Sequence, residues 1–305
     1  MNEQEKSLSD LKIASSKLSD IEYDEIIELI KNSIRLVPVT TAKLKEGALI
    51  DRVRVNTDRK LFYKEDDISY IKDECIIAEK LIEYGRANKP HEVMFYGALE
   101  SSEIPQQRAT AIMETVRLLK DKDAVNIEGL LVTMGRWEVQ EEIEIVEMVF
   151  CTDTIRSNPD VKKAFEYHFE RMKFHPMREL ALLQLDFFSS EFAKKVENNN
   201  DYKVSVAYTD LMLNGKGFAG ITYPSVQSGH KGQNIVLKPE IVDKHLKLTL
   251  AGTLMIYKNK MKTVVNNHKY ALEFGENNSK FNWLDVAAKD VACMEDIMIQ
   301  LGFQN

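Results

Sequence analysis

One segment of the chain predicts a tight turn followed by a buried strand. It reads Tyr84-Gly85-Arg86-Ala87-Asn88-Lys89-Pro90 and, one residue later, Glu92-Val93-Met94-Phe95-Tyr96-Gly97-Ala98. Gly85 marks the turn, and Pro90 forces Lys89 towards an extended backbone. The second run is apolar at successive positions, which is typical of a strand buried on both faces. The segment therefore joins a guanidinium on a turn to an aromatic ring on a strand.

The helix predicted after Pro105 adds a carboxylate to this pair. Its apolar stripe comprises Ala109, Ile112, Met113, Val116 and Leu119. At about 100° per residue, Glu114 points away from the stripe. Periodicity alone makes Glu114 a solvated side chain that pairs with Arg117 at i+3. Ala111 and Leu118 share the face of Glu114, so a second interpretation, in which that face looks into a cleft, stays open.

Outward from this segment, strand and helix signals are mixed without strict β–α–β alternation, which favours an α+β fold over a doubly wound sheet. We expect strands at 48–55, 92–98, 218–223 and 234–238, two strands within 125–150 around Trp137-Glu138, and an antiparallel pair within 246–274 that turns at Lys258-Asn259-Lys260. We expect helices at 7–36, partly at 66–84, after Pro105, at 159–196 with a break at His175-Pro176, at 202–213 and at 284–301.

The composition is that of a soluble globular protein. Hydrophobic residues make up 44% and charged residues 29% of the 305 residues, a mix that supports one large domain or two modest ones. The net charge of −7 argues against broad nucleic-acid binding, which requires a basic surface. It leaves room for a local basic pocket. No run approaches the roughly 18 apolar residues that span a bilayer.

The cysteines, the histidines and the N-terminus exclude further classes. Cys75, Cys151 and Cys293 are odd in number, far apart and without CxxC spacing, which argues against a disulfide framework and a structural zinc site. His168 and His175 lack an HExxH pattern, so we expect no metal. The first residues are polar and lack the apolar core of a signal peptide. We therefore expect a cytoplasmic protein.

Three arginines suggest anion binding. Arg52 and Arg54 lie on one face of their strand because side chains repeat every two residues, and Arg86 lies on the turn beside Asn88. Guanidinium groups on rigid elements suit bidentate contacts with phosphate. The alternative is surface salt bridging, because the chain is rich in Asp and Glu.

The other candidates are a ring, a hydroxyl and a loop. Tyr96 has apolar neighbours, so it is either a core residue with a satisfied hydroxyl or the wall of a ligand pocket. Ser225 ends the run Gly220-Ile221-Thr222-Tyr223-Pro224-Ser225 and either caps the turn or meets a phosphate or ribose. The donor-rich stretch 227–234 is a phosphate cradle or a plain loop, and Asn234 at its end is a binding candidate.

Taken in order, these segments resemble the RES-domain family, which is named for an arginine, a glutamate and a serine. The resemblance covers about residues 48–238 and rests on five short motifs in the family's order: Arg52/Arg54, 85–90, 95–98, Glu114 and 220–225. It implies a core similar to that of the ADP-ribosyltransferase toxins, with two packed small sheets. It also implies three regions: an N-terminal helical extension (1–47), an NAD-binding catalytic domain (48–240) with a helical insertion at about 159–200, and a C-terminal β-hairpin and helix packed on the core (241–305).

The resemblance also assigns roles. It matches the family's first arginine to Arg52 or Arg54, with Arg52 preferred, and the second, in a Gly-Arg-x-Asn turn, to Arg86. The family's serine matches Ser225, with Ser205 as a rival. The implied catalytic residues are Glu114, Tyr96 and Arg86, and the implied substrate-binding residues are Arg52, Arg54, Asn88, Ser225, Ser205 and Asn234.

The implied activity is cleavage of the nicotinamide–ribose bond of NAD, as an NAD phosphorylase or NAD glycohydrolase. The best-studied members of the family are bacterial toxins, so we expect a toxin or defence effector with a protein inhibitor as a potential partner. NAD is the substrate and phosphate a potential co-substrate; no tightly bound cofactor, nucleic acid or membrane is expected. Two alternatives stay open, a protein ADP-ribosyltransferase and a non-catalytic nucleotide-binding or interaction module, dimeric through its terminal helices.

Overall fold

A mixed sheet runs through the part of the chain that the computed structural model describes, residues 3–34, 39–276 and 280–303. Its strands are β1 (Thr41–Leu44), β2 (Leu49–Val55), β3 (Phe95–Leu99), β4 (Asn126–Val139), β5 (Ile143–Glu147), β6 (Gly220–Pro224), β7 (Gln233–Leu237), β8 (Leu246–Lys258), β9 (Thr263–Ala271) and β10 (Leu284–Asp285). The helices are α1 (Glu3–Ala14), α2 (Tyr23–Ser33), α3 (Glu65–Ile68), α4 (Glu74–Lys80), α5 (Gln107–Thr115), α6 (Arg117–Lys120), α7 (Thr152–Ser157), α8 (Pro159–Arg171), α9 (Arg178–Ala193), α10 (Lys203–Asp210), α11 (Pro239–His245) and α12 (Met294–Leu301).

The strand order is β1-β5-β6-β7-β3-β2-β4-β8-β9-β10. The β5–β6 pair is parallel, and the neighbouring β6–β7 and β1–β5 pairs are antiparallel. The mixed sheet with helices packed around it confirms the predicted α+β class. The strands form one continuous sheet, however, where two small sheets were expected.

The two halves of this sheet meet at a narrow seam between β2 and β3. Strand β2 pairs with β4 along its whole length, but with β3 at Asp51 opposite Ala98 alone among the described residues. The Arg52 side chain crosses the same seam, because its Nη1 donates to the Tyr96 carbonyl at 2.7 Å. The sheet is therefore continuous but weakly paired between β2 and β3, where its two halves meet.

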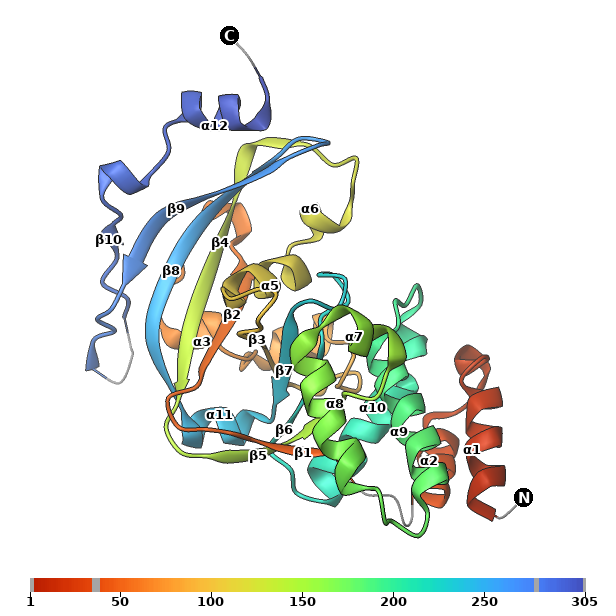
Figure 1. Cartoon of the computed structure of the whole chain (residues 1–305). Helices are drawn as coiled ribbons and strands as arrows, with labels where there is room; N and C mark the ends of the chain where they lie inside the picture. The colour runs from red at the N-terminus through yellow and green to blue at the C-terminus, as the bar shows by residue number, and fades with distance from the viewer. Residues whose placement is uncertain (1–2, 35–38, 277–279, 304–305) are drawn as a thin grey trace.

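Helices cover one face of the sheet in two groups (Figure 1). Helices α1, α2, α9 and α10 pack on β5, β6 and β7 through a cluster that includes Phe188, Phe192, Ile221 and Val236. Helix α5 packs on β2, β3 and β8 through Ile112 and Val116. Strands β4, β8 and β9 project beyond both groups (Figure 1).

The opposite face of the sheet carries a second core around Phe95 and Trp137. Their rings meet edge to face with centroids 5.0 Å apart, and both residues are fully buried. Gly135 lies close by because a Cβ there would approach the indole to 2.4 Å. This core stabilises the seam on this face, because Phe95 belongs to β3 and Trp137 pairs with Ile50 of β2.

Several predicted elements are confirmed. Strands β2 and β3, helix α5 after Pro105, the helix break near His175-Pro176 and the β8–β9 pair all lie where the pattern placed them. Region 7–36 contains two helices where one was expected, and Leu36 lies outside the described residues. In the segment between these two helices, the carbonyls of Leu18 and Ile21 lie outside the regular helical hydrogen bonds. The buried Lys203 ammonium donates to both.

Two predicted boundaries are wrong. The two strands expected within 125–150 are present as β4 and β5, but Trp137-Glu138 lies near the end of β4 and not between the strands. The β-branched content revealed the strands, but the turn falls at residues 140–142. Region 284–301 becomes helical only at α12 and starts as β10, because Leu284 and Asp285 pair with Tyr270 and Lys269 of β9.

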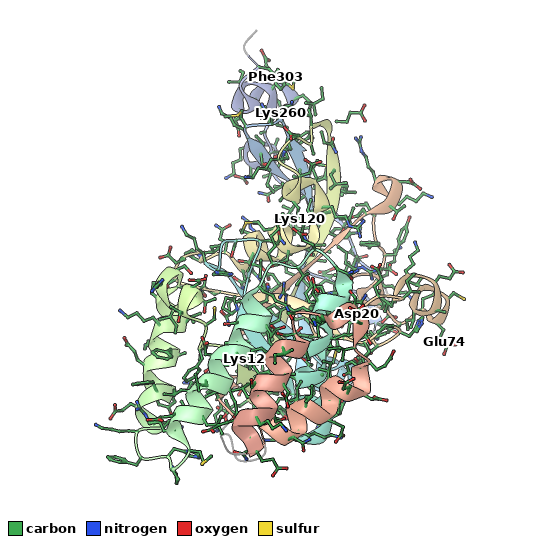
Figure 2. All side chains as sticks on the ribbon, turned by 90° about the vertical axis from the view of Figure 1, so that its right-hand side faces the viewer. Lys12, Asp20, Glu74, Lys120, Lys260 and Phe303 are labelled. Carbon is green, nitrogen blue, oxygen red and sulfur yellow. The ribbon has the colours of Figure 1, made fainter. Side chains whose placement is uncertain are left out.

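The expected outer regions are both integrated into the sheet. Strand β1, from the expected helical extension, pairs with β5, and β8, from the expected C-terminal addition, pairs with β4 over most of its length. Helix α12 then packs on the far end of the β8–β9 hairpin through Ile297 and Leu301. In Figure 2 this end carries Lys260 and Phe303 and stands clear of the helices that carry Lys12 and Asp20. No helix among the described residues is both long and apolar enough to cross a bilayer.

Trp137→Ala is expected to lower the free energy of unfolding by about 3–5 kcal/mol, the usual cost of truncating a buried aromatic residue. Trp137→Phe is expected to cost clearly less. The indole N–H has no hydrogen-bond partner among the residues that the structure describes, and deleting such a buried group removes a penalty of about 1–3 kcal/mol. Urea unfolding measures both values; equal losses would contradict the packing described for this core.

Candidate active site

A cavity of about 220 Å³ opens at the seam between β2 and β3, beneath helix α5. Its walls come from segments far apart in sequence, which the sheet order brings together. The lining residues are Val53, Arg86, Tyr96, Gly97, Ala111, Glu114, Thr115, Lys120, Tyr202, Tyr223, Gln227 and Asn234. All three residues expected to be catalytic, Glu114, Tyr96 and Arg86, therefore line one cavity, and Asn234 joins them.

Glu114 is held by hydrogen bonds to one of its two carboxylate oxygens. Oε1 accepts from the Ser225 hydroxyl at 2.7 Å and from Asn234 Nδ2 at 3.0 Å, with the Gln227 amide at 3.4 Å. Oε2 has no protein hydrogen bond among the described residues. One oxygen thus fixes the side chain while the other remains available to a ligand in the cavity.

This arrangement resolves the two interpretations of Glu114 left open by its sequence. The side chain is directed to β6, β7 and the loop between them instead of to Arg117. Ala111 and Glu114, one turn apart on α5, both line the cavity, whereas Ile112 and Val116 enter the core. The face opposite the apolar stripe does look into a cleft.

The turn before β3 is built around Tyr96. Its hydroxyl accepts from the Ala87 amide at 3.0 Å and donates to Asn88 Oδ1 at 2.7 Å. A side chain at position 85 would overlap Asn88, because a Cβ there would lie 2.3 Å from Oδ1. Burial raises the pKa of Tyr96 above its usual value, so the phenol stays protonated. Asn88 therefore fixes the turn, and no ligand contact of Asn88 follows from this geometry.

Arg86 combines a structural contact with exposure to the cavity. Its Nη1 donates to the Phe192 carbonyl at 2.8 Å and its Nη2 to the Lys194 carbonyl at 3.1 Å. These are free carbonyls at the end of α9, where a cation is stabilised by the helix dipole. The guanidinium also lies over the Tyr202 ring, 4.8 Å from its centroid. A guanidinium has five N–H groups, so donors remain for an anion.

The two candidate serines both act on other site residues and are absent from the cavity lining. Ser225 is fully buried and donates to Glu114. Ser205 is also buried and donates to the Arg86 carbonyl at 2.7 Å. Direct contact with a phosphate or ribose was expected of Ser225. The structure instead makes Ser225 a positioning residue for Glu114 and Ser205 one for the Arg86 turn.

The structure does not bring Arg52 and Arg54 to the cavity. Val53 lines it, so the alternation of a strand directs both arginines to the opposite face. Arg52 donates to the carbonyls of Ser69 and Tyr96 and lies over the Phe95 ring. Burial lowers the pKa of Arg52 to about 9, so it stays charged at neutral pH. Arg54 donates to the Asp67 carbonyl. Arg52 therefore stabilises the seam, and Arg54 holds α3 against β2.

Three cationic or aromatic residues of the cavity had no assigned role from the sequence: Lys120, Tyr202 and Tyr223. Partial desolvation and the nearby Arg117 and Arg86 lower the pKa of Lys120, while Glu114 opposes the shift. Tyr223 was visible as the residue two before Ser225 on a strand. Lys120 and Tyr202 carried no signal, because their approach depends on how α6 and α10 fold back.

Comparison with protein-family models finds no match, and comparison with curated proteins finds no similar chain.

Tyr96→Phe is expected to lower the free energy of unfolding by about 1–3 kcal/mol, because it leaves the buried Ala87 amide and Asn88 Oδ1 without a partner. Tyr167→Phe serves as a matched control. Tyr167 accepts a hydrogen bond from Arg171 at an exposed position, so we expect a change within about 0.5 kcal/mol. Urea unfolding compares the two; a Tyr96→Phe variant as stable as the control would contradict the described turn.

Proposed function

We propose that this chain cleaves the nicotinamide–ribose bond of NAD. The observation that carries the proposal is Glu114, a carboxylate fixed through one oxygen and free at the other, in a cavity shared with Arg86 and three tyrosines. The order of these residues also resembles the RES-domain family. A likeness of the core to ADP-ribosyltransferase toxins is part of the same proposal.

The chemistry of this bond suits such a site. The nicotinamide ring of NAD is positively charged and leaves as a neutral pyridine, so the reaction needs no general acid. Positive charge develops on the ribose as the bond breaks. A fixed carboxylate stabilises that charge without reorganising, which is the most effective form of electrostatic catalysis. Glu114 Oε2 fills this role, and Ser225 and Asn234 hold it in place.

The remaining cavity residues suit the nicotinamide ring at one end and the diphosphate at the other. Tyr96, Tyr202 and Tyr223 offer aromatic faces, which attract a cationic ring. Arg86 and Lys120 supply positive charge for a diphosphate or an incoming phosphate. Phosphate as the acceptor gives ADP-ribose 1″-phosphate, water gives ADP-ribose, and a protein side chain gives an ADP-ribosylated protein. We favour a soluble acceptor because the cationic groups suit an anion.

Glu114→Gln is expected to lower NAD turnover by about 10²–10³-fold, as removal of one preorganised stabilising group does in other enzymes. NAD binding is expected to persist, because glutamine retains the volume and an acceptor oxygen. The assay follows nicotinamide release by chromatography, with and without phosphate, and identifies the second product. Glu79→Gln, at an exposed position on α4, is the matched control and should keep full activity.

Two outcomes of this assay would redirect the proposal. Intact NAD in both buffers, with binding still measurable and unchanged by Glu114→Gln, would leave a non-catalytic nucleotide-binding module. Transfer of label from NAD to a protein in lysate, without free ADP-ribose or its phosphate, would favour a protein ADP-ribosyltransferase.

The Lys120 ammonium gives the reaction a pH dependence. Only the protonated lysine attracts the diphosphate, and its pKa is lowered in the free protein. The KM for NAD should therefore rise with increasing pH through that pKa, below the usual lysine value of about 10.4. Lys120→Met should raise KM at neutral pH and remove this alkaline rise. Lys122→Met, an exposed neighbour, is the control; a rise that persists in Lys120→Met would contradict the assignment.

A further inference from the structure

We propose that a second cavity, formed between α5 and the C-terminal hairpin, binds the adenylate half of the dinucleotide. It has a volume of about 550 Å³. Its lining residues are Gln106, Arg108, Ala109, Ile112, Met113, Leu119, Lys120, Gln227, Leu254, Thr263, Val265 and Asn267. The identity of the ligand rests on the function proposed above, and the site itself rests on this geometry.

The two cavities lie on two sides of one helix and share part of their walls. Ala111, Glu114 and Thr115 of α5 face the first, whereas Ala109 and Met113 face the second. Lys120 and Gln227 line both. A ligand that extends from one cavity to the other therefore passes these two side chains. Figure 2 shows Lys120 at this position, between the helices and the projecting hairpin.

The sizes of the cavities support a divided substrate. Sites for drug-sized ligands occupy about 300–1,000 Å³. The first cavity, at about 220 Å³, is too small for a whole dinucleotide, while the second falls within that range. A substrate with a nicotinamide ribose at Glu114 must place its other half elsewhere, and the shared wall leads to the second cavity.

The lining of the second cavity suits a purine nucleotide. Its walls are mostly apolar, from Ile112, Leu119, Leu254 and other aliphatic side chains, which suits a flat aromatic base. The amide of Asn267 offers a donor and an acceptor to a base edge. The Gln106 amide offers its N–H donors, because its Oε1 accepts from Arg108 Nε at 3.0 Å. The charged lining residues are Arg108 and Lys120, so no carboxylate repels a phosphate. Lys120, at the boundary, is placed to hold the diphosphate.

The C-terminal hairpin is what completes this site. Leu254 belongs to β8, and Thr263, Val265 and Asn267 belong to β9. All four lie beyond residue 240, outside the region of family resemblance. Without β8 and β9 the far side of α5 would face solvent, and its apolar residues Ala109 and Met113 would have no wall opposite them.

The experiment titrates adenosine 5′-monophosphate into the full chain by calorimetry. Val265→Trp should weaken binding at least tenfold because the indole fills the cavity from an exposed strand position, and tryptophan is well tolerated in strands. Leu272→Trp is the matched control: the residue is exposed just after β9 and lines neither cavity. Asn267→Leu, which removes the amide without filling the cavity, should weaken binding severalfold.

The outcomes separate this inference from the proposed function. Monophosphate binding that is undetectable in the unmodified chain at millimolar concentration, or unchanged by Val265→Trp, would overturn the second site whatever the NAD assay shows. Binding that is lost in Val265→Trp but kept in Glu114→Gln supports the site even if NAD is not cleaved. In an active enzyme, Val265→Trp should raise the KM for NAD at least tenfold while leaving turnover of nicotinamide mononucleotide unchanged.

Discussion

The seam between β2 and β3 is the constraint on which the rest of the structure depends. In the described part of the chain, backbone pairing across it is limited to Asp51 and Ala98, so side chains contribute to holding it together. Arg52 crosses it to the Tyr96 carbonyl. On the other edge of β2, the buried Asp51 carboxylate holds β2 to β4, because it accepts two hydrogen bonds of 2.7 and 2.8 Å from Arg136. Breaking a buried pair of this kind costs several kcal/mol, because one charge is left unpaired. The cavity exists because the sheet opens here without coming apart.

Helix α5 closes that opening and gives the site its chemistry. Its apolar residues Ile112 and Val116 anchor it to the sheet, which fixes the direction in which Glu114 points. The Glu114 carboxylate then bonds to Ser225 and Asn234, from β6–β7 on the other half of the sheet. Glu114 thus links the two halves of the sheet on the cavity face of the seam, and Arg52 links them from the opposite face. A group that is held this way is both structural and suited to catalysis.

The C-terminal hairpin changes what this core offers to a ligand. Strand β8 extends the sheet from β4, and β9 brings Val265 and Asn267 opposite the second side of α5. Without this hairpin, one face of α5 would be open to solvent; with it, α5 lies between two cavities. The connection at Lys120 and Gln227 is the reason to consider both cavities as one extended site, with the positive charge at the middle.

The sequence alone determined the α+β class and most of the strands and helices, because periodicity and turn chemistry are local properties. Local patterns left the roles of Arg86, Tyr96 and Glu114 open, and the resemblance to the RES-domain family selected them as site candidates. Only the tertiary structure decided what their neighbours do. Ser225 positions Glu114. Arg52 stabilises the seam, because the alternation of the strand directs Val53 into the cavity and the two neighbouring arginines to the opposite face. Lys120 and Tyr202 reach the site through the path of the chain in space, which no local pattern of residues records.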